Sequence, residues 1–318
     1  MKGRKTFFDE KIVRREYTLT ISIILTILIW LMRADYSIHT WIGLTLTLGI
    51  AYMITGMQKN FSLIRKHTEF MPTIFLIFSA ACCIPSALTI NSIALPALVV
   101  AEFFLFTSYK RDKPYPQIYS CFTFLGIGTL CFPPLLLLLP IILISMRGFL
   151  RVLKGRNIFA AILGLLTPYW FYLAYLLLVD ESLSALFIFN RFSITIPNYS
   201  ILTSPQLITD SVIFIIVMIA AAHILKNAFY EKLRTRMFLY SLLLQTIFLM
   251  GFNLLLPQYQ HTWNLLIIFL ATPFIAHYFA LNKSKSIGLV FIIFILTLLA
   301  LSVINTDYIY EHLISISF

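Results

Sequence analysis

Charged side chains are scarce in this sequence, and long polar stretches that would form a soluble domain are missing. Only 12% of the 318 residues are charged and 60% are hydrophobic, with a mean hydropathy of +0.90. Soluble domains carry roughly 25% charged residues. The connections between apolar runs are nearly all too short for a nucleotide-binding module, which excludes an ATP-driven motor within this chain. The composition predicts an integral membrane protein.

Cysteine and histidine are also sparse, and neither is arranged to bind a metal. The four cysteines lie inside apolar stretches without zinc-site spacing, and the six histidines contain no HExxH pair. No small-x-small cleavage site follows the first apolar run, so that run is predicted to remain as an uncleaved helix. We expect no metal, cofactor or disulfide.

Positive charge is strongly clustered. All but two of the 24 lysines and arginines lie in six short segments, which are 2–15, 59–66, 110–113, 147–156, 226–236 and 283–285. Because basic residues beside helix ends stay in the cytoplasm during insertion, each cluster predicts a cytoplasmic segment. The net charge of +11 is thereby assigned to topology and membrane lipids, and no nucleic-acid partner is expected.

Eleven apolar runs between the clusters are predicted to be transmembrane helices. A helix crosses about 30 Å of hydrocarbon at 1.5 Å per residue. The runs are about 17–33, 41–57, 71–88, 92–109, 117–132, 134–146, 158–179, 207–225, 237–256, 263–281 and 287–304. The prediction is an all-helical, single transmembrane domain over residues 1–318, in the bacterial inner membrane. Its N-terminus, 1–16, lies inside and its C-terminus outside, and the oligomeric state is left open.

Pro133 and Pro134 interrupt the apolar run 117–146, which is too long for one helix. Two consecutive prolines cannot continue a helical hydrogen-bond ladder, so the pair predicts a turn. Basic clusters on both sides of the run require an even number of crossings. Two short spans and a re-entrant pair satisfy that requirement equally.

Only Arg33 and Arg191 fall outside the basic clusters, at the outer end of the first span and in the long outer loop 180–206. A guanidinium suits bidentate binding of a phosphate, and the neighbouring carboxylate of Asp35 suits a general base. One hypothesis is an outer-face site with Asp35 as base and both arginines as phosphate clamps. Lipid-headgroup contact for the arginines and ordinary loop polarity for Asp35 are the alternatives.

Glu102 is the most distinctive polar residue inside a predicted span, about eight residues before Lys110. An ionisable group at that depth costs roughly 2.5 kcal/mol unless it is protonated or paired, so it is expected to face the bundle interior. His223 and His277 lie near the same side of the membrane. A pair of Glu102 with either histidine would be a helix-bridging bond or part of a proton path. Three amides are also predicted to bridge helices: Gln245, Asn253 and Asn264.

A series of motifs runs through residues 91–180. They are Ser108-Tyr109-Lys110, the segment 126–134 (GIGTLCFPP), Arg147-Gly148-Phe149, Arg156, and the segment 164–169 (GLLTPY). This stretch, under a third of the chain, resembles an uncharacterised family of polytopic inner-membrane proteins of Gram-negative bacteria. The resemblance implies location and fold and transfers no catalytic residue.

A looser similarity is to membrane glycosyltransferases that use polyprenyl phosphates and to polysaccharide polymerases, which Asp35 and Arg191 match in placement only. It implies action on a polyprenyl-linked or glycan substrate during envelope assembly, which is the leading hypothesis. A secondary transporter or flippase with proton coupling, using Glu102 and a histidine, is the second. A non-catalytic membrane scaffold is the third.

The outer-face hypothesis predicts that a deletion strain accumulates a lipid-linked glycan precursor. Wild type should clear this precursor, and Asp35→Asn should not, because the base is lost. Glu102→Gln serves as a comparison inside the membrane. Profiling of lipid-linked glycans checks the prediction, and an unchanged profile in the deletion strain would contradict it.

Overall fold

The computed structural model of the chain describes residues 17–33, 38–65, 69–82, 90–179, 204–282 and 286–316. In these ranges there are helices and turns and no strand. The eleven α-helices are α1 (Tyr17–Arg33), α2 (Ile38–Phe61), α3 (Phe70–Cys82), α4 (Ala94–Thr107), α5 (Tyr115–Cys131), α6 (Leu139–Gly148), α7 (Gly155–Leu178), α8 (Ser204–Asn227), α9 (Leu233–Leu255), α10 (Gln260–Leu281) and α11 (Ile287–Ile316). Four 3₁₀ segments join them, η2 (Ile90–Ile93), η3 (Pro133–Leu138), η7 (Ala228–Tyr230) and η8 (Pro257–Tyr259).

The prediction of an all-helical fold is confirmed for the described residues, and each of the eleven predicted spans overlaps one α-helix. The predicted span 134–146 begins in η3, and the predicted span 71–88 extends past α3 into residues outside the described ranges. Six helical segments are long and apolar enough to cross a membrane: Thr40–Phe61, Ile90–Thr107, Gly155–Leu178, Gln206–Tyr230, Leu233–Leu255 and Pro257–Leu281. The shorter ones include α6, whose ten residues extend only about 15 Å.

Internal contacts divide the chain into two compact units. The first unit is Met1–Leu88, Tyr199–Leu239 and Ile267–Phe318, and the second is Thr89–Asn198 and Tyr240–Leu266. Helices α9 and α10 each contribute residues to both units. The prediction of a single transmembrane domain stays a prediction.

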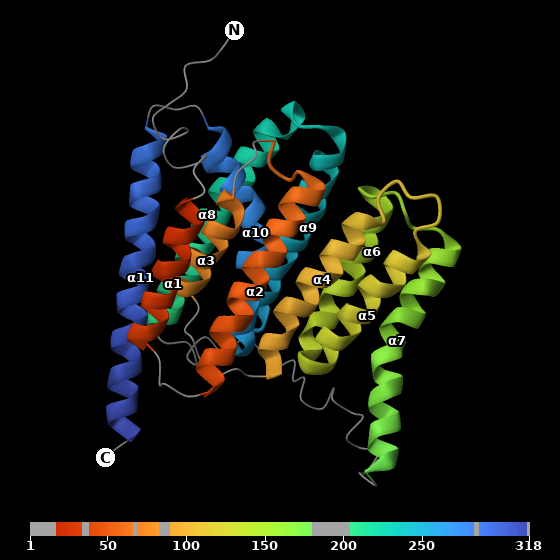
Figure 1. Cartoon of the computed structure of the whole chain (residues 1–318), viewed down its shortest axis with the longest axis horizontal. Coiled ribbons are helices and arrows are strands. Elements are labelled where there is room, and N and C mark those ends of the chain that lie inside the picture. Colours follow the sequence, from red (N-terminus) through yellow and green to blue (C-terminus); the bar gives the residue numbers. More distant parts are fainter. Residues whose placement is uncertain are drawn as a thin grey trace. The chain divides into compact units, whose positions relative to one another are not determined.

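In the first unit, α3 is the central helix. It packs against α1, α2 and α11 (Figure 1), and all but one of its thirteen residues are buried. Aromatic side chains form much of this core. Phe70 contacts Phe279 and Phe291, and Phe78 contacts Phe294. A helix that is apolar all round, as α3 is, is buried on every side.

In the second unit, α5 lies between α4 and α7. Glycines allow α5 and α7 to approach closely. A Cβ atom on Gly164 would overlap the Tyr119 carbonyl oxygen, and one on Gly126 would lie 2.7 Å from the Leu165 carbonyl oxygen. Small residues at a membrane helix interface permit such close backbone contact.

Two hydroxyl pairs also join α5 to α7. The Tyr169 hydroxyl donates to Thr129 Oγ1 at 2.9 Å, and the Tyr119 and Thr167 hydroxyls share a bond of 2.9 Å. Six of the residues in this contact belong to the motif segments 126–134 and 164–169, namely Gly126, Thr129, Gly164, Leu165, Thr167 and Tyr169. These motifs therefore have a packing role in the second unit.

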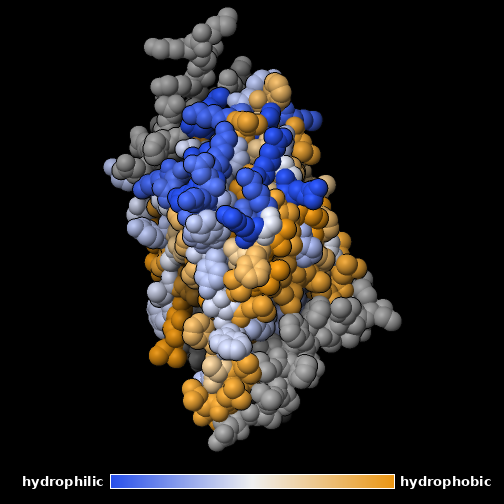
Figure 2. Space-filling view, turned by 90° about the vertical axis from the view of Figure 1, so that its right-hand side faces the viewer, coloured by the Kyte–Doolittle hydropathy of each residue, from blue (hydrophilic) through white to orange (hydrophobic). Residues whose placement is uncertain are grey.

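The proline pair forms the predicted turn. Helix α5 ends at Cys131, η3 begins at Pro133, and α6 then returns toward the end of the second unit where α5 begins (Figure 1). The basic connections 108–114 and 149–154 consequently lie at the same end of this unit. Their lysines and arginines are exposed, and Figure 2 shows hydrophilic side chains gathered at one end of a face, above a broad hydrophobic area.

Gly164→Ala should lower the stability of the protein by about 1–3 kcal/mol, because the new methyl group meets backbone that cannot yield without moving α5. Thermal unfolding in detergent, followed by the loss of monodisperse protein, measures the effect. Gly251→Ala on α9 is the matched control, since among the described residues outside its own turn of helix no atom lies within 4 Å of the position that its methyl group would occupy. The control should be neutral or stabilising, and equal melting temperatures for both variants would contradict the packing account.

Candidate functional site

The predicted outer-face residues have little described structure. Asp35 and Arg191 lie outside the described residues, and Arg33 is known only as the last residue of α1. The outer-face site therefore stays a prediction. The polar residues predicted inside the spans, in contrast, are all described.

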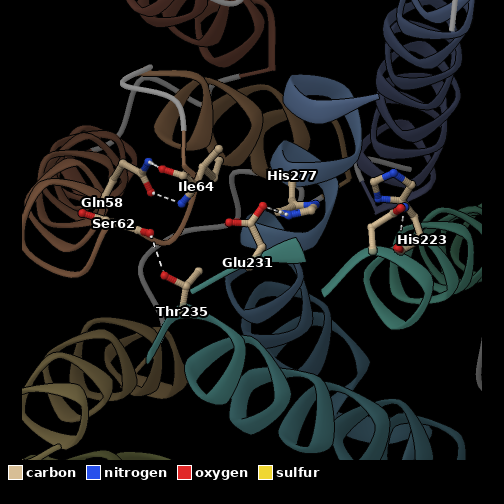
Figure 3. A network of polar contacts seen from close by, with 8 residues as sticks. Gln58, Ser62, Ile64, His223, Glu231, Thr235 and His277 are labelled. Carbon is tan, nitrogen blue, oxygen red and sulfur yellow. Dashed lines mark hydrogen bonds and ion pairs between the residues drawn. The ribbon is translucent and has the colours of Figure 1, made fainter. Parts of the chain in front are cut away.

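A polar network joins the ends of several helices in the first unit (Figure 3). Gln58 lies near the end of α2, and its side-chain amide binds both backbone groups of Ile64, which follows the helix. Nε2 donates to the Ile64 carbonyl at 3.1 Å, and Oε1 accepts from the Ile64 amide at 3.2 Å. The intervening Ser62 has a left-handed φ of 49°, and its carbonyl accepts from Thr235 Oγ1 at 3.2 Å. These bonds fasten the turn after α2 to the start of α9.

Glu231 and His277 lie in a buried contact beside this turn. His277 Nε2 lies 3.5 Å from Glu231 Oε1, and the side chains are 1% and 4% exposed. The distance is longer than an ordinary N–H···O hydrogen bond. His223 packs its ring edge-on to His277 with centroids 5.6 Å apart, and Arg65 lies close enough to act on His277 electrostatically.

This arrangement brings together His223 and His277, which the sequence singled out, with a carboxylate that it did not. Glu231 is the only acidic residue in the basic segment 226–236, and this feature of the sequence could have singled it out. It follows η7, whose Ala228 carbonyl accepts from the Glu231 amide at 3.1 Å. The expected pairing of Glu102 with either histidine would join the two units, and it stays a prediction.

Glu102 lies in the second unit, on α4, with only 1% of its surface exposed. The Cys121 thiol on α5 and the Gln245 amide on α9 lie beside its carboxyl group. Even so, neither carboxyl oxygen completes a hydrogen bond with any residue in the described ranges. Burial without such bonds strongly disfavours the ionised form, so the uncharged carboxyl is the form that this site accommodates.

Buried amides continue along α9. Gln245 Nε2 donates to Ser241 Oγ at 3.4 Å, and Asn253 Nδ2 donates to Asn264 Oδ1 on α10 at 3.2 Å. The prediction that amides bridge helices is confirmed for the Asn253–Asn264 pair. Gln245 Oε1 and Asn253 Oδ1 lack a hydrogen-bond partner among the described residues.

The described part of the chain contains no group of three or more His, Cys, Asp or Glu placed to hold a metal ion. Comparison with known proteins gives no relative: no family model matches the sequence, and no curated protein or solved structure is similar to it. Function is therefore inferred from these residues and their geometry.

The Glu231–His277 pair predicts thermodynamic coupling. Glu231→Ala should destabilise the protein, because it leaves the buried imidazole without its partner, whereas the same change in a His277→Ala background should cost less. The expected coupling is about 1 kcal/mol, from a double-mutant cycle of thermal unfolding. Strict additivity of the two substitutions would show that the pair contributes nothing.

Proposed function

We propose that this chain is a multi-pass protein of the bacterial inner membrane, with its basic connections in the cytoplasm, its N-terminus inside and its C-terminus outside. The proposal is supported by six helical segments of membrane-spanning length and by exposed basic residues at one end of the second unit. Positive residues beside helix ends are retained in the cytoplasm.

Within that setting the protein acts as a proton-coupled secondary transporter, and Glu102 carries the proton. The observation that supports this role most directly is the burial of the Glu102 carboxyl without a completed hydrogen bond in the described structure. An ionisable residue inside a transmembrane helix is costly, and proton relays in transporters are a common reason to keep one. Its neighbours, a thiol and an amide, supply no opposite charge to hold it ionised.

The other two hypotheses receive less support. The lipid-linked glycan hypothesis depends on Asp35, Arg33 and Arg191. The side chains of these three residues lie outside the described structure. A scaffold needs only packed apolar helices. A buried carboxyl would lower the stability of such a bundle without contributing to its role. The division into two units that share α9 and α10 is compatible with a transporter, in which one bundle moves against another.

Proton movement through Glu102 predicts a pH-dependent current. Purified full-length protein in proteoliposomes on a sensor should give a transient current after a pH step, as protons bind. Glu102→Gln should reduce this current to that of protein-free liposomes, because the amide cannot take up a proton. The variant should remain folded, since it removes an ionisable group from an apolar interior.

Asp112→Asn is the matched control, since Asp112 is exposed in the connection between α4 and α5. It removes a carboxylate from the same unit and should leave the current unchanged. A Glu102→Gln protein with the current of the wild type would refute the role of Glu102. Equal loss in both variants would assign the effect to general electrostatics.

A further inference from the structure

Exposed cations gather at the end of the second unit where α5 and α7 begin (Figure 1). Seven lysines and arginines lie in the segments 110–113 and 147–156, and all seven side chains are exposed. Asp112 is the only acidic residue between positions 108 and 156. These two segments, called the basic end below, therefore carry a concentrated positive charge that attracts anions.

The backbone of the second segment is held firmly against the helices. Leu150 and Val152 are buried, and their amides donate to the Ser145 and Met146 carbonyls at 3.1 and 3.0 Å. Between them, Arg151 is exposed and has a left-handed φ of 55°. Because its neighbours on both sides are anchored, the cation of Arg151 is positioned before any ligand arrives, which lowers the entropy cost of binding.

The cations of this segment have no partner inside the protein. Arg147, Arg151, Lys154 and Arg156 form no hydrogen bond, ion pair or ring contact in the described structure. Basic residues of the first unit differ in this respect. Arg234 lies 5.4 Å from the ring of Phe238, and Arg236 lies 5.7 Å from the ring of Phe229. The basic end of the second unit is thus available to an anion from outside the chain.

An apolar surface adjoins the basic end. Tyr115 and Tyr119 on α5 are exposed, and so are Phe159 and Leu163 on α7. The two helices are in contact at this level, because Gly164 lies against the Tyr119 carbonyl. Phe159 and Leu163 follow Arg156 by three and seven residues, about 4.5 and 10.5 Å along the helix. One molecule with an anionic head and an apolar chain can therefore contact both the cations and this surface.

From this juxtaposition we propose that the basic end binds an anionic phospholipid with two phosphate groups, a cardiolipin. Lysine and arginine are the residues that bind phosphate, and arginine does so with two parallel hydrogen bonds. Each of the two segments brings at least three cations, so each can hold one phosphate. A zwitterionic lipid would bring its own cation, which the basic end repels. Basic sites between transmembrane helices recognise such headgroups in general.

Thermal unfolding of the purified full-length protein in a nonionic detergent tests this site. Added cardiolipin should raise the melting temperature by about 5 °C at about 100 times its Kd, because it binds the folded state. Phosphatidylcholine and inorganic pyrophosphate should not. A wild-type protein that phosphatidylcholine stabilises equally would overturn the proposal, and equal stabilisation by pyrophosphate would assign the basic end to a soluble anion instead.

The double variant Arg151→Gln with Lys154→Gln locates the site. Each cation near a lipid surface contributes about 1 kcal/mol, so the Kd for cardiolipin should rise about thirtyfold. Without lipid the variant should melt as the wild type does, since these side chains have no described contact to lose.

Lys226→Gln with Lys232→Gln is the matched control, because both lysines are exposed, lie in the first unit and carry the same charge. This variant should keep the Kd of the wild type. Equal weakening in both double variants would show that cardiolipin responds only to net charge and would overturn the site. The result does not depend on proton transport, since a protein without a proton current can still bind the lipid.

Discussion

Every polar group inside an apolar helix bundle has to find its partner within the protein, and the described structure is organised by that constraint. Threonine hydroxyls return to backbone carbonyls one turn earlier, as Thr246 and Thr272 do. Asn253 binds Asn264 across two helices, and Glu231 lies beside His277. Some buried groups do not meet it: the Glu102 carboxyl completes no hydrogen bond in the described ranges, and neither do the ring nitrogens of His277.

Close packing in the second unit makes the burial of the Glu102 carboxyl energetically unfavourable. In the second unit, α5 is held against α7 by backbone contact at Gly126 and Gly164 and against α4, the helix that carries Glu102. Tightly packed interiors do not yield to admit compensating groups. The unfavourable burial of the carboxyl is therefore not relieved by rearrangement of the residues around it. Burial of this kind favours the protonated carboxyl, the form in which a proton carrier is loaded.

The sequence predicted the helices well for a physical reason: a basic cluster lies at one end of each apolar run, so the eleven segments could be placed without any knowledge of packing. The same pattern singled out Glu102, His223, His277 and Gln245 as interior polar residues. Their partners could not be predicted, because Glu231 lies 46 residues from His277, and Gln245 lies on a helix far along the chain from Glu102. Asp35 and Arg191 lie outside the described residues, so the predicted outer-face site stays a hypothesis.

Labelling with a hydrophobic carbodiimide tests the central claim about Glu102 most directly, because the reagent modifies protonated carboxyl groups in apolar surroundings. The full-length protein is treated in membranes over a range of pH, and adducts are located by mass spectrometry. The account predicts an adduct on Glu102 whose yield falls as the pH rises, while exposed Asp112 stays unmodified. Absence of the Glu102 adduct at every pH, or a yield that does not change with pH, would contradict it.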